Sequence, residues 1–126
     1  MRKPLPPSLY AETAIPPVPT PPLDGDARVS VAIIGGGFTG LSTALHLAQQ
    51  GVQTVVLEAQ EPGWGASGRN GGQVNPGLKH DPDQIEKDFG ADLGGRMIAL
   101  SGNAPNVVFN LVQQHQIACE AIQSGT

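Results

Sequence analysis

The chain has 126 residues, of which 39% are hydrophobic and 14% charged, and its formal net charge is −4. This length fits one small domain. A negative net charge without a cluster of lysine and arginine argues against nucleic acid or an anionic membrane surface as a partner. A single cysteine, Cys119, excludes an internal disulfide and a zinc site built from several cysteines of this chain.

The amino-terminal 27 residues differ in texture from the rest of the chain. Residues 1–27 carry eight of the twelve prolines, which disfavour both helix and sheet. We expect a proline-rich arm here, and composition alone does not separate an arm docked on the surface from a disordered leader. No apolar signal segment follows the basic start at residues 1–3, so we expect a cytoplasmic protein with no membrane partner.

Three elements of a βαβ unit follow the arm. Residues 29–34 are β-branched and apolar, which predicts a buried strand. Residues 38–50 carry apolar side chains at helical spacing, with Gly51 at the expected end of the helix. Residues 54–58 predict a second buried strand, parallel to the first. The fold class is therefore α/β, with a Rossmann-type βαβ dinucleotide-binding domain from residue 28 onward.

Two further helices are expected in the last third of the chain. Residues 81–89 form a short helix with an N-cap aspartate and a proline at the first helical position. Gly94 or Gly95 is expected to break it. A second helix over 96–115 is expected to be kinked or interrupted near Pro105.

A glycine motif, G-x-G-x-x-G, lies between the first strand and the first long helix. Gly35 allows the tight turn, Gly37 lets the backbone approach a pyrophosphate, and Gly40 permits close packing of the helix on the strand. Phe38 and Thr39 start the helix, where unpaired N–H groups and a partial positive charge stabilise a diphosphate. The competing interpretation is a tight turn in a parallel sheet with no ligand.

An acidic residue ends the second strand, as this motif requires. Glu58, followed by Ala59, is placed to accept hydrogen bonds from ribose hydroxyls, and its charge disfavours the 2′-phosphate of NADP. Taken alone, Glu58 would be explained better as a solvated strand end.

A second glycine-rich segment, residues 63–73, decides between FAD and NAD. A nicotinamide enzyme needs no such loop after the second strand, whereas a long dinucleotide needs a second clamp made of backbone N–H groups and polar side chains. A plain surface loop is the alternative. The residues we assign to the cofactor in this segment are Ser67, Arg69, Asn70, Gly71, Gly72 and Gln73.

Other chemically active residue types are scattered. His46, His80 and His115 lack the spacing of metal ligands, so we expect no metal site. Cys119 is expected to be a small buried or half-buried residue rather than a nucleophile. Trp64 is expected to pack the second glycine-rich segment against the domain.

Residues 33–42, 55–59 and 63–73 together resemble the D-amino-acid oxidase superfamily of FAD-dependent amine oxidoreductases. Residues 63–72 and the arm around residues 8–11 are most similar to the gamma-glutamylputrescine oxidase branch. The resemblance covers nearly the whole chain but only the first third or so of a usual family member. We therefore expect residues 28–126 to be the amino-terminal part of a truncated FAD-binding domain, whose partner is the remainder of the same polypeptide.

The resemblance implies an enzyme that oxidises a C–N bond of a small-molecule amine or amino acid by hydride transfer to flavin, with oxygen as acceptor. Some relatives attach FAD through a histidine in the second glycine-rich segment, but Arg69 stands at that place, which implies non-covalent FAD. No catalytic residue is expected in this portion. An NAD-dependent dehydrogenase, or a nucleotide-binding module without catalysis, remains the alternative.

Overall fold

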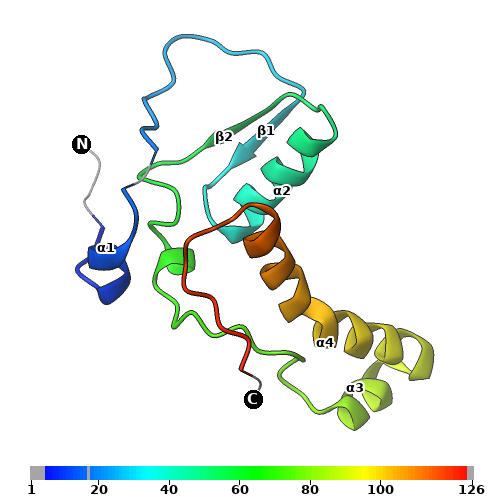
Figure 1. Cartoon of the computed structure of the whole chain (residues 1–126). Coiled ribbons are helices and arrows are strands. Elements are labelled where there is room, and N and C mark those ends of the chain that lie inside the picture. Colours follow the sequence, from blue (N-terminus) through cyan, green and yellow to red (C-terminus); the bar gives the residue numbers. More distant parts are fainter. Residues whose placement is uncertain (1–4, 17, 125–126) are drawn as a thin grey trace. The chain divides into compact units, whose positions relative to one another are not determined.

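The computed structural model describes residues 5–16 and 18–124. The chain forms two compact units, Met1–Gly71 and Gly72–Thr126, called here the first and second unit. The first unit contains both strands of the sheet, and the second is helical (Figure 1). Because the cofactor motif lies in the first unit, that unit positions the candidate site.

The core of the first unit is a strand, a helix and a parallel strand. β1 spans Val31–Ile34, α2 spans Phe38–Gln49, and β2 spans Thr54–Leu57. Val31 pairs with Thr54 and Ile34 with Leu57 in a parallel register. This arrangement confirms the predicted α/β class and the βαβ unit. α2 and β2 each end one residue earlier than predicted, so Glu58 follows β2 directly.

The first strand is shorter than predicted because the chain only joins the sheet at residue 30. The backbone N–H groups of Ser30 and Val31 both donate to the carbonyl of Gln53, at 3.2 Å each. The hydrogen bonds between the two strands begin at this shared acceptor, and Val29 lies before them in the chain. Regular pairing therefore begins at Val31 rather than at residue 29.

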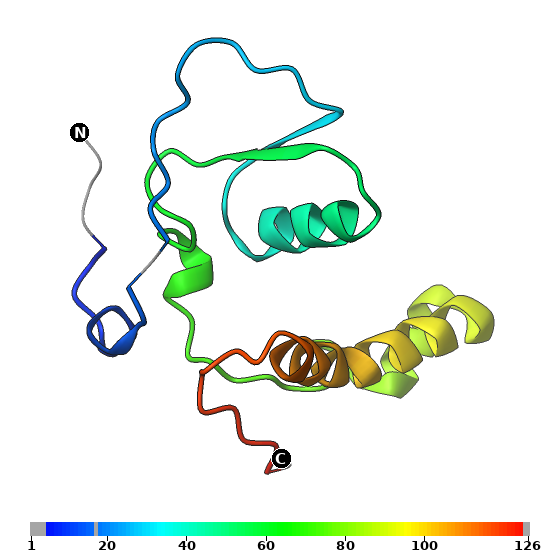
Figure 2. The ribbon, with the colours of Figure 1, turned by 45° about the horizontal axis from the view of Figure 1, so that its top comes forward.

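One face of the sheet is covered by α2 (Figure 2). Ile33 faces this helix, since a Cβ atom added to Gly40 would lie 3.3 Å from its Cγ2 atom. Ile34 points to the other face and is 80% exposed. The sheet thus has one covered face and one apolar face that is open at Ile34.

The arm contains a helix that the sequence did not predict. α1 spans Leu9–Thr13, and the Ser8 hydroxyl caps it by accepting a hydrogen bond from the Ala11 N–H at 3.1 Å. The arm therefore combines one helical turn with an extended, proline-rich stretch that leads into β1.

The second unit is a helix pair, and here one boundary prediction is wrong. α3 spans Pro82–Phe89, as predicted, and α4 spans Ala91–Gln114. The break falls at Gly90, whose φ of 80° only glycine adopts easily, and not at Gly94 or Gly95. Gly94 is instead a buried residue within α4. A Cβ atom at this position would come within 2.8 Å of the Glu86 Cα atom of α3.

Two other expectations for the second unit need correction. α4 is not interrupted near Pro105, because a long helix tolerates one lost N–H donor when its other backbone bonds hold, while a kink there stays a prediction. Cys119 is exposed rather than buried, because it follows the end of α4 in a segment without regular structure.

Candidate functional site

The turn between β1 and α2 has the backbone geometry that the glycine motif requires. Gly35 has a φ of 102°, a region that side chains other than glycine rarely adopt, and its N–H donates to the Leu57 carbonyl at 2.8 Å. A Cβ atom on Gly40 would overlap the carbonyl oxygen of Gly35. These two glycines let the chain turn sharply and begin α2 directly against the sheet.

The first turn of α2 presents backbone donors at the carboxyl end of the sheet. Gly37 is the N-cap and has no side chain with which to cap the helix, while Phe38, Thr39 and Gly40 form the first turn. N–H groups in the first turn have no acceptor within the helix. The start of α2 is therefore a place where oxygen acceptors from elsewhere are stabilised.

Glu58 lies across the turn from the start of α2. Its Oε2 atom accepts a hydrogen bond from the Gly36 N–H at 2.6 Å, and its Oε1 atom accepts one from the Gln60 N–H at 2.9 Å. The Gly36 N–H, followed by the Gln60 N–H, holds the pKa of this carboxyl below its ordinary value, although partial burial opposes the shift. Glu58 is therefore a fixed, ionised acceptor with lone pairs left for ligand hydroxyls.

The second glycine-rich segment returns to the same turn. The N–H of Gly63 donates to the carbonyl of Gly36 at 2.8 Å. Further on, a short 3-10 helix, η1 (Ala66–Gly68), brings the Ser67 hydroxyl to the start of α2, where it accepts from the Phe38 N–H at 3.0 Å. A Cβ on Gly37 would lie only 2.9 Å from this hydroxyl oxygen. The loop and the motif thus form one site.

Two other polar side chains of this segment, those of Arg69 and Asn70, bond to the loop itself. Arg69 donates through Nε to the carbonyl of Trp64 at 3.0 Å, and its guanidinium carbon lies 4.4 Å from the centre of the Trp64 ring. Asn70 donates through Nδ2 to the carbonyl of Ser67 at 2.5 Å. These contacts stiffen the loop that carries Ser67.

The structure brings together most of the residues that the sequence assigned to the cofactor. The start of α2, Glu58 and Ser67 are joined by the hydrogen bonds above, and Gly71 lies at the end of the same unit. Gly72 and Gln73 begin the second unit, where both are exposed. They are therefore not part of the unit that carries the start of α2.

Sequence reasoning missed Gly36 and Gly68. Gly36 is buried and bonds to both Glu58 and Gly63, and a Cβ on it would lie 3.2 Å from the Glu58 Oε2 atom. A Cβ on Gly68 would overlap the carbonyl of Gly63. The sequence signal for Gly36 is that a glycine also occupies the first variable position of the G-x-G-x-x-G motif, where any residue is accepted.

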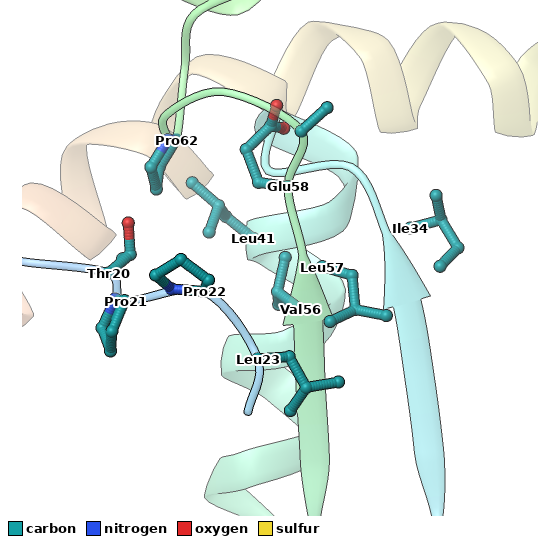
Figure 3. Close-up of a pocket in the computed structure, with 11 residues that line it drawn as sticks. Thr20, Pro21, Pro22, Leu23, Ile34, Leu41, Val56, Leu57, Glu58 and Pro62 are labelled. Atoms are coloured by element: carbon teal, nitrogen blue, oxygen red, sulfur yellow. The ribbon is translucent and has the colours of Figure 1, made fainter. Parts of the chain in front are cut away.

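A groove of about 480 Å³ lies beside Glu58, along β2 (Figure 3). Ala59 and Pro62 border it at the end of β2, and Leu41 borders it from α2. Residues 20–23 of the arm form another part of its lining. The predicted residues Glu58 and Ala59 therefore face a largely apolar groove as well as the turn.

Within the described residues, no group of three or more histidine, cysteine or acidic side chains is placed to hold a metal ion. None of the helices in that part of the chain is long and apolar enough to cross a membrane.

Comparison with known proteins identifies the family. A family model described as FAD dependent oxidoreductase matches residues 30–126. The chain belongs to this FAD-dependent oxidoreductase family. FAD, rather than NAD, is thus the dinucleotide that members of the family use.

Several curated relatives are named as oxidoreductases or dehydrogenases. The chain is 40% identical to gamma-glutamylputrescine oxidoreductase of Escherichia coli K12 over 94% of this chain and 28% of the relative. It is 38% identical to a probable oxidoreductase OrdL of Rhizobium meliloti over 88% of this chain and 26% of the relative. A D-proline dehydrogenase of Pyrobaculum islandicum shares 57% identity over 35 residues, which are 28% of this chain and 10% of the relative.

The chain therefore spans about a quarter of the length of the first two relatives. No solved structure gives a significant match.

The residues present fit an FAD pyrophosphate and ribose. The Ser67 hydroxyl at 3.0 Å from the Phe38 nitrogen shows that this N–H is directed at an oxygen acceptor outside the helix. Gly37, the N-cap of α2, carries no side chain, and glycine at such a position lets a diphosphate approach the backbone. Glu58 lies where a dinucleotide bound at such a turn would need an acceptor for its ribose hydroxyls.

Proposed function

We propose that the whole protein is an oxidase of a small-molecule amine or amino acid, which breaks a C–H bond next to nitrogen and leaves a C=N bond. The 40% identity to gamma-glutamylputrescine oxidoreductase over nearly all of this chain is the observation that carries the proposal. FAD, when bound, supplies the acceptor for the hydride, with oxygen as the final acceptor that is reduced to peroxide. The first unit contributes cofactor binding rather than substrate chemistry.

The chain's own residues orient the cofactor in this proposal. The start of α2 holds the pyrophosphate by backbone N–H groups, and Glu58 accepts from the adenosine ribose. The segment from Ser67 to Gly71 is proposed to run past the pyrophosphate toward the flavin end. Through its contacts with Trp64, Arg69 is proposed to fix this segment.

Binding is proposed to be non-covalent, and substrate recognition is proposed to belong to other parts of the polypeptide. A cytoplasmic location remains a prediction from the sequence. The amine class as a whole is supported by two relatives whose names specify a C–N substrate, one acting on gamma-glutamylputrescine and one on D-proline.

The test uses the full-length protein loaded with FAD. Gamma-glutamylputrescine is mixed with it without oxygen, and bleaching of the flavin absorbance is followed; oxygen is then admitted and peroxide is measured. Putrescine, which lacks the glutamyl group, is the matched control, and D-proline tests the second substrate class. Bleaching by any of these amines, followed by about one peroxide per flavin, supports the proposal. Bleaching only by a non-amine donor such as an alcohol would contradict it.

A further inference from the structure

The arm lies outside the region that the family model matches, yet it reaches the candidate site at two places. The family model begins at residue 30, whereas residues 20–23 line the groove beside Glu58. Farther toward the amino terminus, the Tyr10 hydroxyl donates to the carbonyl of Gly71 at 2.9 Å. Figures 1 and 2 show the arm passing the carboxyl end of β2 on its way to α1.

We propose that the arm is part of the cofactor site, with residues 20–23 as the outer wall for the adenosine end of FAD and Tyr10 as a tether for the second glycine-rich segment. The proposal rests on the proposed FAD site at α2 and Glu58. It adds residues that precede the family domain. Tyr10 acts through Gly71 and is thus a positioning residue.

The position of Glu58 selects adenosine as the occupant of the groove. Glu58 bonds to Gly36 at the turn into α2 and also lines the groove. A dinucleotide whose pyrophosphate lies at the start of α2 and whose ribose reaches Glu58 continues into the space on the other side of that carboxylate. The first group in that direction is the base, so the groove beyond Glu58 receives it.

The chemistry of the wall suits a flat, weakly polar base. Pro21, Pro22 and Leu23 of the arm and Val56 of β2 are apolar (Figure 3). The volume of about 480 Å³ lies within the range of ~300–1,000 Å³ that small-ligand sites usually have. Two consecutive prolines have little backbone freedom, so this wall is stiff before a ligand binds.

The tether explains how a short helix in the arm is held. α1 has five residues, too few to be stable by itself in water. It is supported by the Ser8 cap and by the Tyr10 hydroxyl, whose acceptor lies 61 residues away in the chain. Because Gly71 belongs to the second glycine-rich segment, which carries Ser67, the same contact restricts the loop that meets the start of α2.

The groove wall is tested with ADP, which has the adenosine and pyrophosphate of FAD but no flavin. Apoprotein of the full-length chain is titrated with ADP and with FAD by calorimetry. Leu23→Asp places a carboxylate in the wall of the groove; because Leu23 is 55% exposed, this change does not remove a core residue. Val18→Asp is the matched control, since Val18 belongs to the same arm, is 83% exposed and does not line the groove.

We expect Leu23→Asp to weaken both ADP and FAD by about 10-fold, Leu23→Ala to weaken both by about 3-fold, and Val18→Asp to change neither by more than about 2-fold. Equal affinities of the Leu23→Asp and Val18→Asp proteins for ADP and FAD would contradict the assignment of residues 20–23 as a wall of the adenosine site. A lower melting temperature of Leu23→Asp with unchanged ADP affinity would also overturn it, since the groove would then receive another segment of the polypeptide. Failure of the unmodified apoprotein to bind either ligand would instead contradict the proposed FAD site.

The tether is tested by Tyr10→Phe, which removes one hydroxyl and keeps the ring. We expect amide hydrogen exchange of residues 63–71 to become at least about 3-fold faster in the apoprotein, with the Val18→Asp protein as control. Affinity for ADP is expected to change less than in Leu23→Asp, because the wall is intact. Unchanged exchange in residues 63–71 would overturn the role of Tyr10.

Discussion

Glycine allows close backbone approach in both units, but with different results. In the first unit, glycines bring backbone close to oxygen atoms: Gly40 approaches the carbonyl of Gly35, and Gly37 approaches the Ser67 hydroxyl. In the second unit, Gly94 brings α4 close to the backbone of α3 and no polar site results. Close backbone approach is therefore a sign of a ligand site only where a helix start and a fixed carboxylate lie beside it, as at α2 and Glu58.

The largest effect is expected from Gly40→Ala in the first unit. The new methyl group would overlap the Gly35 carbonyl, so β1 and α2 would have to separate, at a cost of about 3 kcal/mol or more. We expect the full-length protein to lose FAD and to melt at a lower temperature. Gly102→Ala, where the methyl group meets nothing within 4 Å, is the control. A Gly40→Ala protein with normal FAD content would break the comparison.

The next effect concerns Glu58→Gln. The amide has one acceptor oxygen in place of two, so its NH2 group would face the N–H of Gly36 or Gln60, and we expect FAD to bind about 10-fold more weakly at neutral pH. Because hydrogen bonds lower the pKa of Glu58 in the folded protein, its contribution is present above the pKa of the unfolded chain and is lost as the pH falls through the lowered value.

Melting temperatures measured from neutral to acid pH check this sign. The difference in stability between unmodified protein and Glu58→Gln should shrink as the pH falls through the acidic range. A difference that grows on acidification would contradict the assignment of Glu58 as an ionised acceptor.

A smaller effect is expected from Gly94→Ala in the second unit, and it should be confined to stability. The methyl group would come within 2.8 Å of the Glu86 Cα atom, and a gain in helix propensity offsets part of the strain, leaving a net loss of about 1–2 kcal/mol. FAD affinity of the folded protein should not change, as measured by titration of the apoprotein. Weaker FAD binding in this variant would contradict the prediction that Gly94 affects stability alone.

The smallest effect is expected from Ser67→Ala. Removing the hydroxyl takes away the acceptor at the Phe38 N–H, which costs about 1 kcal/mol, or about 5-fold in FAD affinity if the hydroxyl also supports the bound state. Ser101→Ala, which removes a hydroxyl bonded within α4, is the control. Equal FAD affinity in both variants would limit Ser67 to holding the loop.

Local rules account for the parts of the fold and site that the sequence predicted. Gly35 and Gly51 have positive φ and lie at ends of elements, and Glu58 follows a short apolar strand, so each is marked by its immediate neighbours. The role of Gly36 depends on Glu58, 22 residues away, and no local pattern contains it. Contacts of this kind are only visible once the strands are paired.

Tertiary packing explains the boundaries that the sequence placed wrongly. Glycine occurs at positions 90, 94 and 95, and each could end a helix by propensity alone. The choice falls on Gly90 because Gly94 is needed where α4 crosses Glu86. The contact of Tyr10 with Gly71 was equally hidden, since a proline-rich arm carries no signal for the surface on which it lies.

The absorption spectrum of the purified full-length protein tests the central claim most directly, namely that the first unit holds FAD without a covalent bond. The account predicts a flavin band near ~450 nm whose pigment passes through a filter after denaturation. It also predicts that the band is missing from Gly40→Ala and retained in Gly94→Ala. A protein with no such band after addition of FAD, or with pigment that stays attached after denaturation, would contradict the account.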